Sequence, residues 1–256
     1  MDFSKVKAIV TGGASGLGEA TVRHIAESGG RAVIFDLNEE RAQAVMADFD
    51  EGQVGYIETD VTNALQVEES VGIAVDQLGH INLLVNCAGI ATPGKVVSKG
   101  QPLAFERFEK VIQVNLVGSF NVLRVVAAAM QGNESNEEGE RGVIISTASV
   151  AAFEGQIGQA AYSASKGGIV SMTLPIAREL ARDGIRVLAI APGLMQTPMF
   201  EGLPESTIAS LSATVPFPAR LGRPVEYAKL VKSIVDNPLL NGEVIRLDGA
   251  IRMQPK

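Results

Sequence analysis

Three side chains within residues 149–166 have the types and the spacing of a proton-transfer site. Tyr162 and Lys166 lie four residues apart in AAYSASKGGIVSM, whose small residues and apolar spacing predict a helix. Residues i and i+4 of a helix lie side by side, and a neighbouring ammonium lowers a tyrosine pKa from about 10 toward the range useful for acid/base catalysis at neutral pH. The pair therefore predicts a general acid/base, although a helix start with a solvated lysine has the same pattern.

Ser149 is expected to complete this site. It follows the apolar run 142–145, which is typical of a buried parallel strand. Its hydroxyl would then lie at the carboxyl end of a strand, where open α/β sheets bind their ligands.

The segment 6–18, VKAIVTGGASGLG, combines an apolar strand with a glycine-rich turn. Glycines let the backbone approach a pyrophosphate, which the N–H groups and dipole of the following helix then bind. A second strand ends in Asp36, which suits hydrogen bonds to adenosine ribose hydroxyls. This order of elements predicts a dinucleotide site. The turn residues expected to bind the cofactor are Gly12, Ser15, Gly16, Leu17 and Gly18.

Together these motifs resemble the short-chain dehydrogenase/reductase family, in the family's order along nearly the whole chain. Further matches are Asp60-Val61 after a third strand, NCAG at 86–89 after a fourth, Asn115 in a helix, and Pro192-Gly193 after a sixth. Cys87 stands where the family usually has a second Asn, a change that should leave the adjacent backbone turn intact.

The resemblance implies a catalytic set of Asn115, Ser149, Tyr162 and Lys166, in which Asn115 holds a water that relays protons from Lys166 to solvent. By its apolar neighbours alone, Asn115 is equally a hydrogen-bonded core residue. Asp60 and Thr197 also suit plain caps or turns. The remaining implied cofactor contacts are Asp60, Val61, Asn86, Ala88, Gly89, Tyr162, Lys166, Pro192, Gly193 and Thr197.

The resemblance also implies a Rossmann-type fold, with a doubly wound parallel seven-stranded sheet and helices on both faces. Strand and helix patterns alternate along all 256 residues, 46% of which are apolar, and no linker divides them. A single domain over residues 1–256 is therefore expected. Residues 194–220, with several Met and Phe, resemble a lid over an apolar substrate, although a surface helix with one buried face would have the same composition.

Residues 142–180, with VPFPARLG and NGEVIRLDGAIRMQP, are closely similar to one branch of the family, the type-2 3-hydroxyacyl-CoA dehydrogenases, also called type-10 17β-hydroxysteroid dehydrogenases in animals. This implies an NAD-dependent enzyme that interconverts L-3-hydroxyacyl-CoA and 3-ketoacyl-CoA, with Tyr162 as acid/base and Ser149 bound to the substrate oxygen. Gln159 is a candidate substrate donor or a surface residue. Lys95 and Lys99 are candidate contacts to the coenzyme A phosphates or solvated lysines.

Other functions stay open. The alternatives within the family are a hydroxysteroid dehydrogenase and a 3-ketoacyl-carrier-protein reductase. A dinucleotide-binding sensor or scaffold without chemistry is a different class. The presence of all four catalytic residues favours an enzyme.

Charge and composition narrow the partners and the compartment. A net charge of −7 disfavours nucleic-acid or anionic-membrane binding. The first strand begins about six residues from Met1, which leaves no room for a targeting peptide, and no uninterrupted apolar run reaches a membrane-spanning length. The single Cys87 fits a reducing compartment. We expect a cytoplasmic protein, and the resemblance implies a homotetramer.

No metal site is expected. The two histidines, His24 and His80, lie far apart in the sequence without zinc-ligand spacing.

Overall fold

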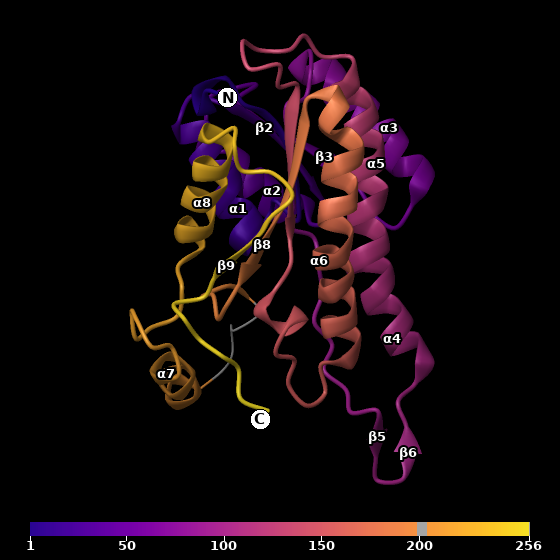
Figure 1. Cartoon of the computed structure of the whole chain (residues 1–256), viewed down its shortest axis with the longest axis vertical. Coiled ribbons are helices and arrows are strands. Elements are labelled where there is room, and N and C mark those ends of the chain that lie inside the picture. Colours follow the sequence, from indigo (N-terminus) through magenta and orange to yellow (C-terminus); the bar gives the residue numbers. More distant parts are fainter. Residues whose placement is uncertain (199–203, 256) are drawn as a thin grey trace.

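A seven-stranded parallel sheet runs through the centre of the molecule (Figure 1). The computed structural model describes residues 1–198 and 204–255. The strand order is β3-β2-β1-β4-β7-β8-β9, so the direction of winding reverses between β1 and β4. This confirms the predicted doubly wound sheet. The strands are β1 (Lys7–Thr11), β2 (Arg31–Asp36), β3 (Val54–Glu58), β4 (Leu83–Asn86), β7 (Gly142–Thr147), β8 (Ile185–Pro192) and β9 (Val244–Leu247).

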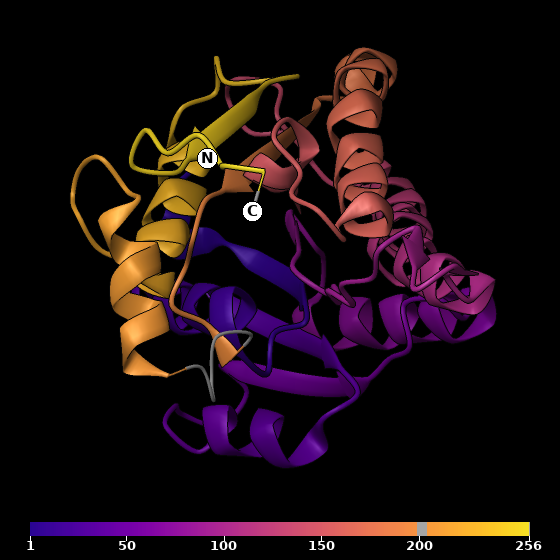
Figure 2. The ribbon, with the colours of Figure 1, turned by 90° about the horizontal axis from the view of Figure 1, so that it is seen from below.

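Helices cover both faces of the sheet, as Figure 2 shows from below. One face packs against α1 (Gly16–Glu27), α2 (Glu39–Met46) and α8 (Pro224–Asp236). The other packs against α3 (Ala64–Leu78), α5 (Ser119–Gln131) and α6 (Ala160–Leu180).

Because successive side chains of a strand point to opposite faces, a strand covered on both sides must be apolar throughout. In β1, Ile9 joins one core cluster and Val10 the other. All eight residues of β8 are buried. This explains why the central strands appear in the sequence as continuous apolar runs.

The helical stretch that carries Asn115 changes its winding in the middle. α4 (Phe105–Ile112) leads into a π-helical segment, Gln113–Gly118, and then into α5. The whole stretch Phe105–Gln131 is long and apolar enough, by length and composition only, to cross a membrane, although Arg124 interrupts its apolar run. Half of the most apolar part of this stretch is buried inside the fold. Core helices of ordinary globular proteins are often equally long and apolar.

Two segments extend beyond the carboxyl edge of the sheet (Figure 1). Residues 91–104 contain a short hairpin of β5 (Val97–Ser98) and β6 (Gln101–Pro102). The predicted lid, 194–220, contains α7 (Glu205–Ala213). Of its apolar residues, Met195 is buried in the core, whereas Met199, Phe200 and Leu203 lie outside the described residues.

The connection 131–141 is polar and acidic in sequence, but its end is not an exposed loop. Glu140 is buried, and its Oε1 lies 2.7 Å from the Nε of buried Arg186 in β8. The Arg186 guanidinium also donates to the carbonyl oxygens of Ile234, Val235 and Leu240. The ion pair therefore fixes the end of α8 to the sheet. The sequence hid this role because Glu140 is one acid among several in a polar run.

We predict that Glu140→Ala destabilises the fold by about 3–5 kcal/mol, because it leaves the Arg186 charge buried without its counterion. The exposed neighbour Glu138→Ala is the matched control and should change the free energy of unfolding by less than about 0.5 kcal/mol. Urea denaturation measures both. Equal effects of the two substitutions would contradict the importance of the buried pair.

Candidate active site

The three predicted catalytic side chains come from two neighbouring elements. Ser149 lies two residues past the end of β7 and caps the short 3₁₀ turn Val150–Ala152. Its Oγ accepts a hydrogen bond from the Ala151 N–H at 3.1 Å. Tyr162 and Lys166 lie on successive turns at the start of α6. The predicted strand end and the predicted helix are therefore both confirmed.

Lys166 is deeply buried. Its side chain is held by the carbonyl oxygen of Thr147, which accepts a hydrogen bond from Nζ at 2.6 Å. Nζ also lies 5.8 Å from the centre of the Tyr162 ring. Because burial penalises the charged ammonium, the pKa of Lys166 falls to about 8.

We expected Lys166 to lower the pKa of Tyr162. For the protein without a bound cofactor this is wrong. Burial raises the pKa of Tyr162 above 10, and a hydrogen bond with Ser149 opposes this only in part. The ammonium of Lys166 is held on the Thr147 carbonyl oxygen instead. At neutral pH Tyr162 therefore keeps its proton, which is the form that donates to a carbonyl oxygen.

Asn115 connects three parts of the site. Its Oδ1 accepts from the Ile90 N–H at 2.8 Å, and its Nδ2 donates to the Ile90 carbonyl oxygen at 2.9 Å and to Ser165 Oγ at 3.1 Å. A Cβ at Gly89 would lie 3.3 Å from Asn115 Oδ1 and 3.7 Å from Lys166 Nζ, so the turn after β4 packs tightly here. Asn115 is therefore confirmed as a hydrogen-bonded core residue. Its role in a proton relay stays a prediction.

The glycine turn has the geometry of a dinucleotide cradle. Gly12 has a φ of 63°, and a Cβ at Gly18 would lie 2.1 Å from the Gly12 carbonyl oxygen, so only glycine lets α1 pack onto the turn. α1 begins at Gly16, and within the described part of the chain the preceding Ser15 side chain makes no capping hydrogen bond. The first N–H groups of α1 are thus available to an anion. Leu17 packs against the core and anchors the helix.

Asp36 is fixed against this turn. Its carboxylate accepts hydrogen bonds from the N–H groups of Ala14 at 3.1 Å and Leu37 at 2.8 Å. The predicted ribose acceptor therefore lies next to the predicted pyrophosphate cradle, and the residues fit a nicotinamide adenine dinucleotide. When bound, that group would supply the hydride acceptor or donor.

The sequence did not indicate that Thr11, which precedes the glycine turn, joins two turns of the site. Its Oγ1 accepts from the N–H groups of Cys87 at 3.2 Å and Ala88 at 3.1 Å, and so joins the glycine turn to the NCAG turn. Thr147, the partner of Lys166, was missed as well. Thr11 and Thr147 are each the last residue of a strand. This position is the only feature of the sequence that could have indicated their roles.

The Asp60 region differs in detail from the sequence expectation. The cap of α3 is Asn63, whose side chain accepts from the Gln66 N–H. The Asp60 carboxylate instead accepts from the N–H and hydroxyl of Thr62. Asp60 is therefore not the cap of α3, and that interpretation is wrong. Its contact with adenine stays a prediction. Val61 is buried against Gly118.

The remaining cofactor candidates lie along the same edge. Asn86 ends β4 and donates from Nδ2 to the Ser119 carbonyl oxygen. Pro192 ends β8, and a Cβ at Gly193 would lie 2.9 Å from the Cα of Asp248. Thr197 lies beside the glycine turn, because a Cβ at Gly16 would be 3.5 Å from the Thr197 Cβ.

Gln159 lies at the start of α6, where its Oε1 accepts from the Gln156 N–H at 2.9 Å. Its side chain thus stabilises the loop before α6, and a contact with substrate stays a prediction.

Cys87 has an enclosed thiol whose pKa is raised by burial, which agrees with a structural role. Within residues 1–198 and 204–255, no group of three or more His, Cys, Asp or Glu side chains has the arrangement of a metal site.

The fold, the glycine cradle and the Ser-Tyr-Lys arrangement define a nucleotide-dependent dehydrogenase, and comparison with known proteins agrees. The model of the short chain dehydrogenases matches residues 6–207. The chain belongs to the short-chain dehydrogenase/reductase family.

Relatives within the family are similar over their full length. The human protein named 3-hydroxyacyl-CoA dehydrogenase type-2 is 54% identical, over 97% of this chain and 95% of its own. The protein of the same name from Drosophila melanogaster is 51% identical, over 96% and 97%. The crystal structure of 3-hydroxyacyl-CoA dehydrogenase type-2 from Mycobacterium avium superposes with a TM-score of 0.95 at 42% identity, over 99% of this chain and 98% of that one.

We predict that Tyr162→Phe lowers kcat by about 10²–10⁴-fold, because it removes the acid/base hydroxyl. The dissociation constant for NADH should stay within about twofold, since the hydroxyl contributes little cofactor-binding surface. Steady-state kinetics and NADH fluorescence titration measure the two quantities. A variant that kept more than about a tenth of the wild-type rate would show that another group carries the proton.

Proposed function

We propose that this protein is an NAD-dependent dehydrogenase that interconverts an L-3-hydroxyacyl-CoA and the corresponding 3-ketoacyl-CoA. The observation that carries the proposal is the convergence of Ser149, Tyr162 and Lys166 at the sheet edge that also holds the glycine turn. The names of the relatives that are 51–54% identical over nearly the whole chain support the substrate class.

In the reductive direction, protonated Tyr162 donates its proton to the 3-keto oxygen. The Ser149 hydroxyl, whose Oγ accepts from the Ala151 N–H, keeps its own proton to donate a hydrogen bond to the same oxygen. Lys166 would hold the nicotinamide ribose hydroxyls of a bound cofactor, and its charge would stabilise negative charge that develops on the tyrosine oxygen. In the oxidative direction the same groups act in reverse: Tyr162 must first lose its own proton, and the resulting phenolate then accepts the proton of the 3-hydroxyl.

Asp36 supports a preference for NAD over NADP. Its carboxylate is held by the N–H groups of Ala14 and Leu37 at the end of β2. A 2′-phosphate at the adenosine ribose would meet this negative charge, whereas a free 2′-hydroxyl can donate a hydrogen bond to it.

Two segments beyond the sheet edge support an acyl-CoA substrate. A pocket at the base of the lid has four apolar lining residues that suit an acyl chain, Leu194, Met195, Val215 and Pro218. Three charged residues, Arg220, Glu226 and Asp248, also line it. On the hairpin side, Lys95 is exposed, and the exposed Lys99 lies at the turn between β5 and β6. Their charges suit the phosphates of coenzyme A.

The proposal includes a homotetramer in the cytoplasm. Apolar side chains lie exposed on the α4–α5 stretch and on α6, where a second copy would cover them: Phe105, Val117, Phe120 and Leu174. The single free Cys87 supports a reducing compartment.

We expect wild-type kcat/KM to be at least about tenfold higher with NADH than with NADPH, because the Asp36 carboxylate repels the 2′-phosphate. Asp36→Ala should remove most of this difference by raising KM for NADH and lowering KM for NADPH. The exposed Glu69→Ala on α3 is the control and should keep the wild-type ratio. Equal wild-type values for the two cofactors would contradict the assignment.

We also expect acetoacetyl-CoA to be reduced with a higher kcat/KM than a carrier-protein thioester or a 17-ketosteroid, each assayed with NADH. Salt, Lys95→Ala and Lys99→Ala should raise KM for the CoA ester and leave KM for the uncharged steroid unchanged. The exposed Lys110→Ala on α4 is the control. A tenfold advantage of steroid or carrier-protein substrate would overturn the acyl-CoA assignment, and a flat response to the lysine variants would remove only those contacts.

A further inference from the structure

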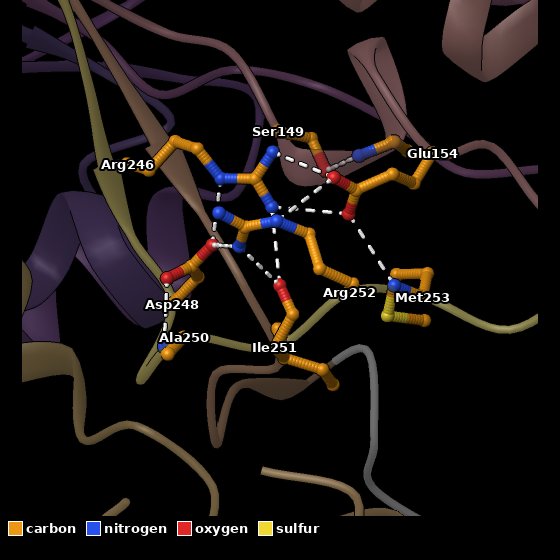
Figure 3. Close-up of polar contacts among 9 residues, drawn as sticks. Ser149, Glu154, Arg246, Asp248, Ala250, Ile251, Arg252 and Met253 are labelled. Atoms are coloured by element: carbon orange, nitrogen blue, oxygen red, sulfur yellow. Dashed lines mark hydrogen bonds and ion pairs between the residues drawn. The ribbon is translucent and has the colours of Figure 1, made fainter. Parts of the chain in front are cut away.

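The turn that carries Ser149 is held by a cluster of charges from the C-terminal strand and tail (Figure 3). Arg246 of β9 forms a two-pronged ion pair with Glu154, with distances of 2.8 Å from Nη1 to Oε1 and 3.0 Å from Nη2 to Oε2. The Nε of Arg246 also lies 2.7 Å from Asp248 Oδ2. Arg252 completes the cluster at 3.2 Å from Asp248 and 3.4 Å from Glu154.

Glu154 is connected directly to the Ser149 turn. Its own N–H donates to the Val150 carbonyl oxygen at 2.9 Å and so closes the turn that begins at Ser149. The N–H of Ala151, inside this turn, is the donor that Ser149 Oγ accepts. Because Oγ only accepts there, its proton stays free to be donated elsewhere. The turn therefore sets the position of the Ser149 Oγ.

The loop after Glu154 is held from two further sides. A Cβ at Gly155 would lie 2.2 Å from Ser163 Oγ, so the loop packs against α6 one residue past Tyr162. From the tail, the Pro255 carbonyl oxygen accepts from the Ile157 N–H at 3.0 Å, and the Gln254 carbonyl oxygen accepts from Gln156 Nε2 at 3.1 Å. A displacement of Glu154 would thus reach both Ser149 and the start of α6.

Arg246 itself has a rigid support. β9 pairs with β8 along its whole length, and the Leu247 carbonyl oxygen accepts from the Gly193 N–H at 2.9 Å. Arg246 therefore projects from the sheet edge that also positions the predicted cofactor contact Gly193.

We propose that Glu154 and Arg246 are positioning residues, which fix the Ser149 hydroxyl relative to Tyr162 through their two-pronged ion pair. A two-pronged pair of this kind fixes orientation as well as distance. Both side chains are about a fifth exposed, at 22% and 23%, so solvent weakens the attraction and geometry is the larger effect. The inference rests on the proposed catalytic role of Ser149 and is independent of the acyl-CoA assignment.

The test is a double-mutant cycle with Ser149→Ala. Glu154→Gln keeps the shape of the side chain and removes its charge. We expect it to lower kcat at least about tenfold in the wild-type background, since a displacement of about 1 Å at a reacting group can cost about 10²-fold. In the Ser149→Ala background the same change should cost less than about threefold, because the hydroxyl it positions is gone. The dissociation constant for NADH should stay within about twofold in both.

The control is Glu68→Gln, which weakens the exposed ion pair with Arg124 between α3 and α5 and should leave kcat unchanged. Arg246→Lys retains the positive charge but cannot form the two parallel hydrogen bonds of the guanidinium. The same double-mutant cycle with this variant therefore tests the pair from its other side. An unchanged kcat, or an equal loss in both Ser149 backgrounds, would overturn the proposal.

Amide hydrogen exchange provides a second readout that needs no turnover. Glu154→Gln and Arg246→Lys should each speed exchange at the N–H groups of 151–154, while amides of β1 and α1 keep their protection. Unchanged exchange at 151–154 would contradict the positioning role. A wild-type protein that is inactive on acetoacetyl-CoA, with the exchange result as expected, would contradict the proposed substrate and leave the positioning inference supported.

Discussion

The burial of the Lys166 ammonium is the constraint on which the rest of the site depends. An ammonium removed from water needs polar partners, or it loses its proton. Thr147 supplies a carbonyl oxygen at 2.6 Å, and its place at the end of β7 puts that oxygen beside the first turns of α6. The hydrogen bond from Lys166 to Thr147 therefore ties the start of α6 to the end of β7.

Strand order turns this local constraint into a site. The carboxyl ends of parallel strands share one edge, and the winding reverses between β1 and β4. Thr11, at the end of β1, joins its own glycine turn to the turn after β4 through the N–H groups of Cys87 and Ala88. Asn115 then joins the turn after β4 to α6 through Ile90 and Ser165. The predicted cofactor cradle and the proton-transfer groups are thus connected by hydrogen bonds between segments far apart in the sequence.

The sequence predicted the features that depend on local geometry. The glycine turn, the strand ending in Asp36 and the helical spacing of Tyr162 and Lys166 were all found as expected. Features set by three-dimensional surroundings were missed or misjudged. The direction of the Tyr162 pKa depends on how deeply the ring is buried, and the role of Glu140 depends on an arginine 46 residues away. No local pattern contains either fact.

The loop that follows Ser149 shows why such distant contacts are needed. Residues 153–159, FEGQIGQ, contain two glycines and belong to no regular helix or strand, so they lack the repeated backbone hydrogen bonds that hold such an element. Apolar packing alone would let this loop shift along its neighbours, because the hydrophobic effect has no preferred direction. Hydrogen-bonded charges are directional, and the two arginines and two carboxylates of the cluster have no net charge together, so no excess charge opposes their close approach. A segment without regular secondary structure thus takes its precision from the strand at the far end of the chain.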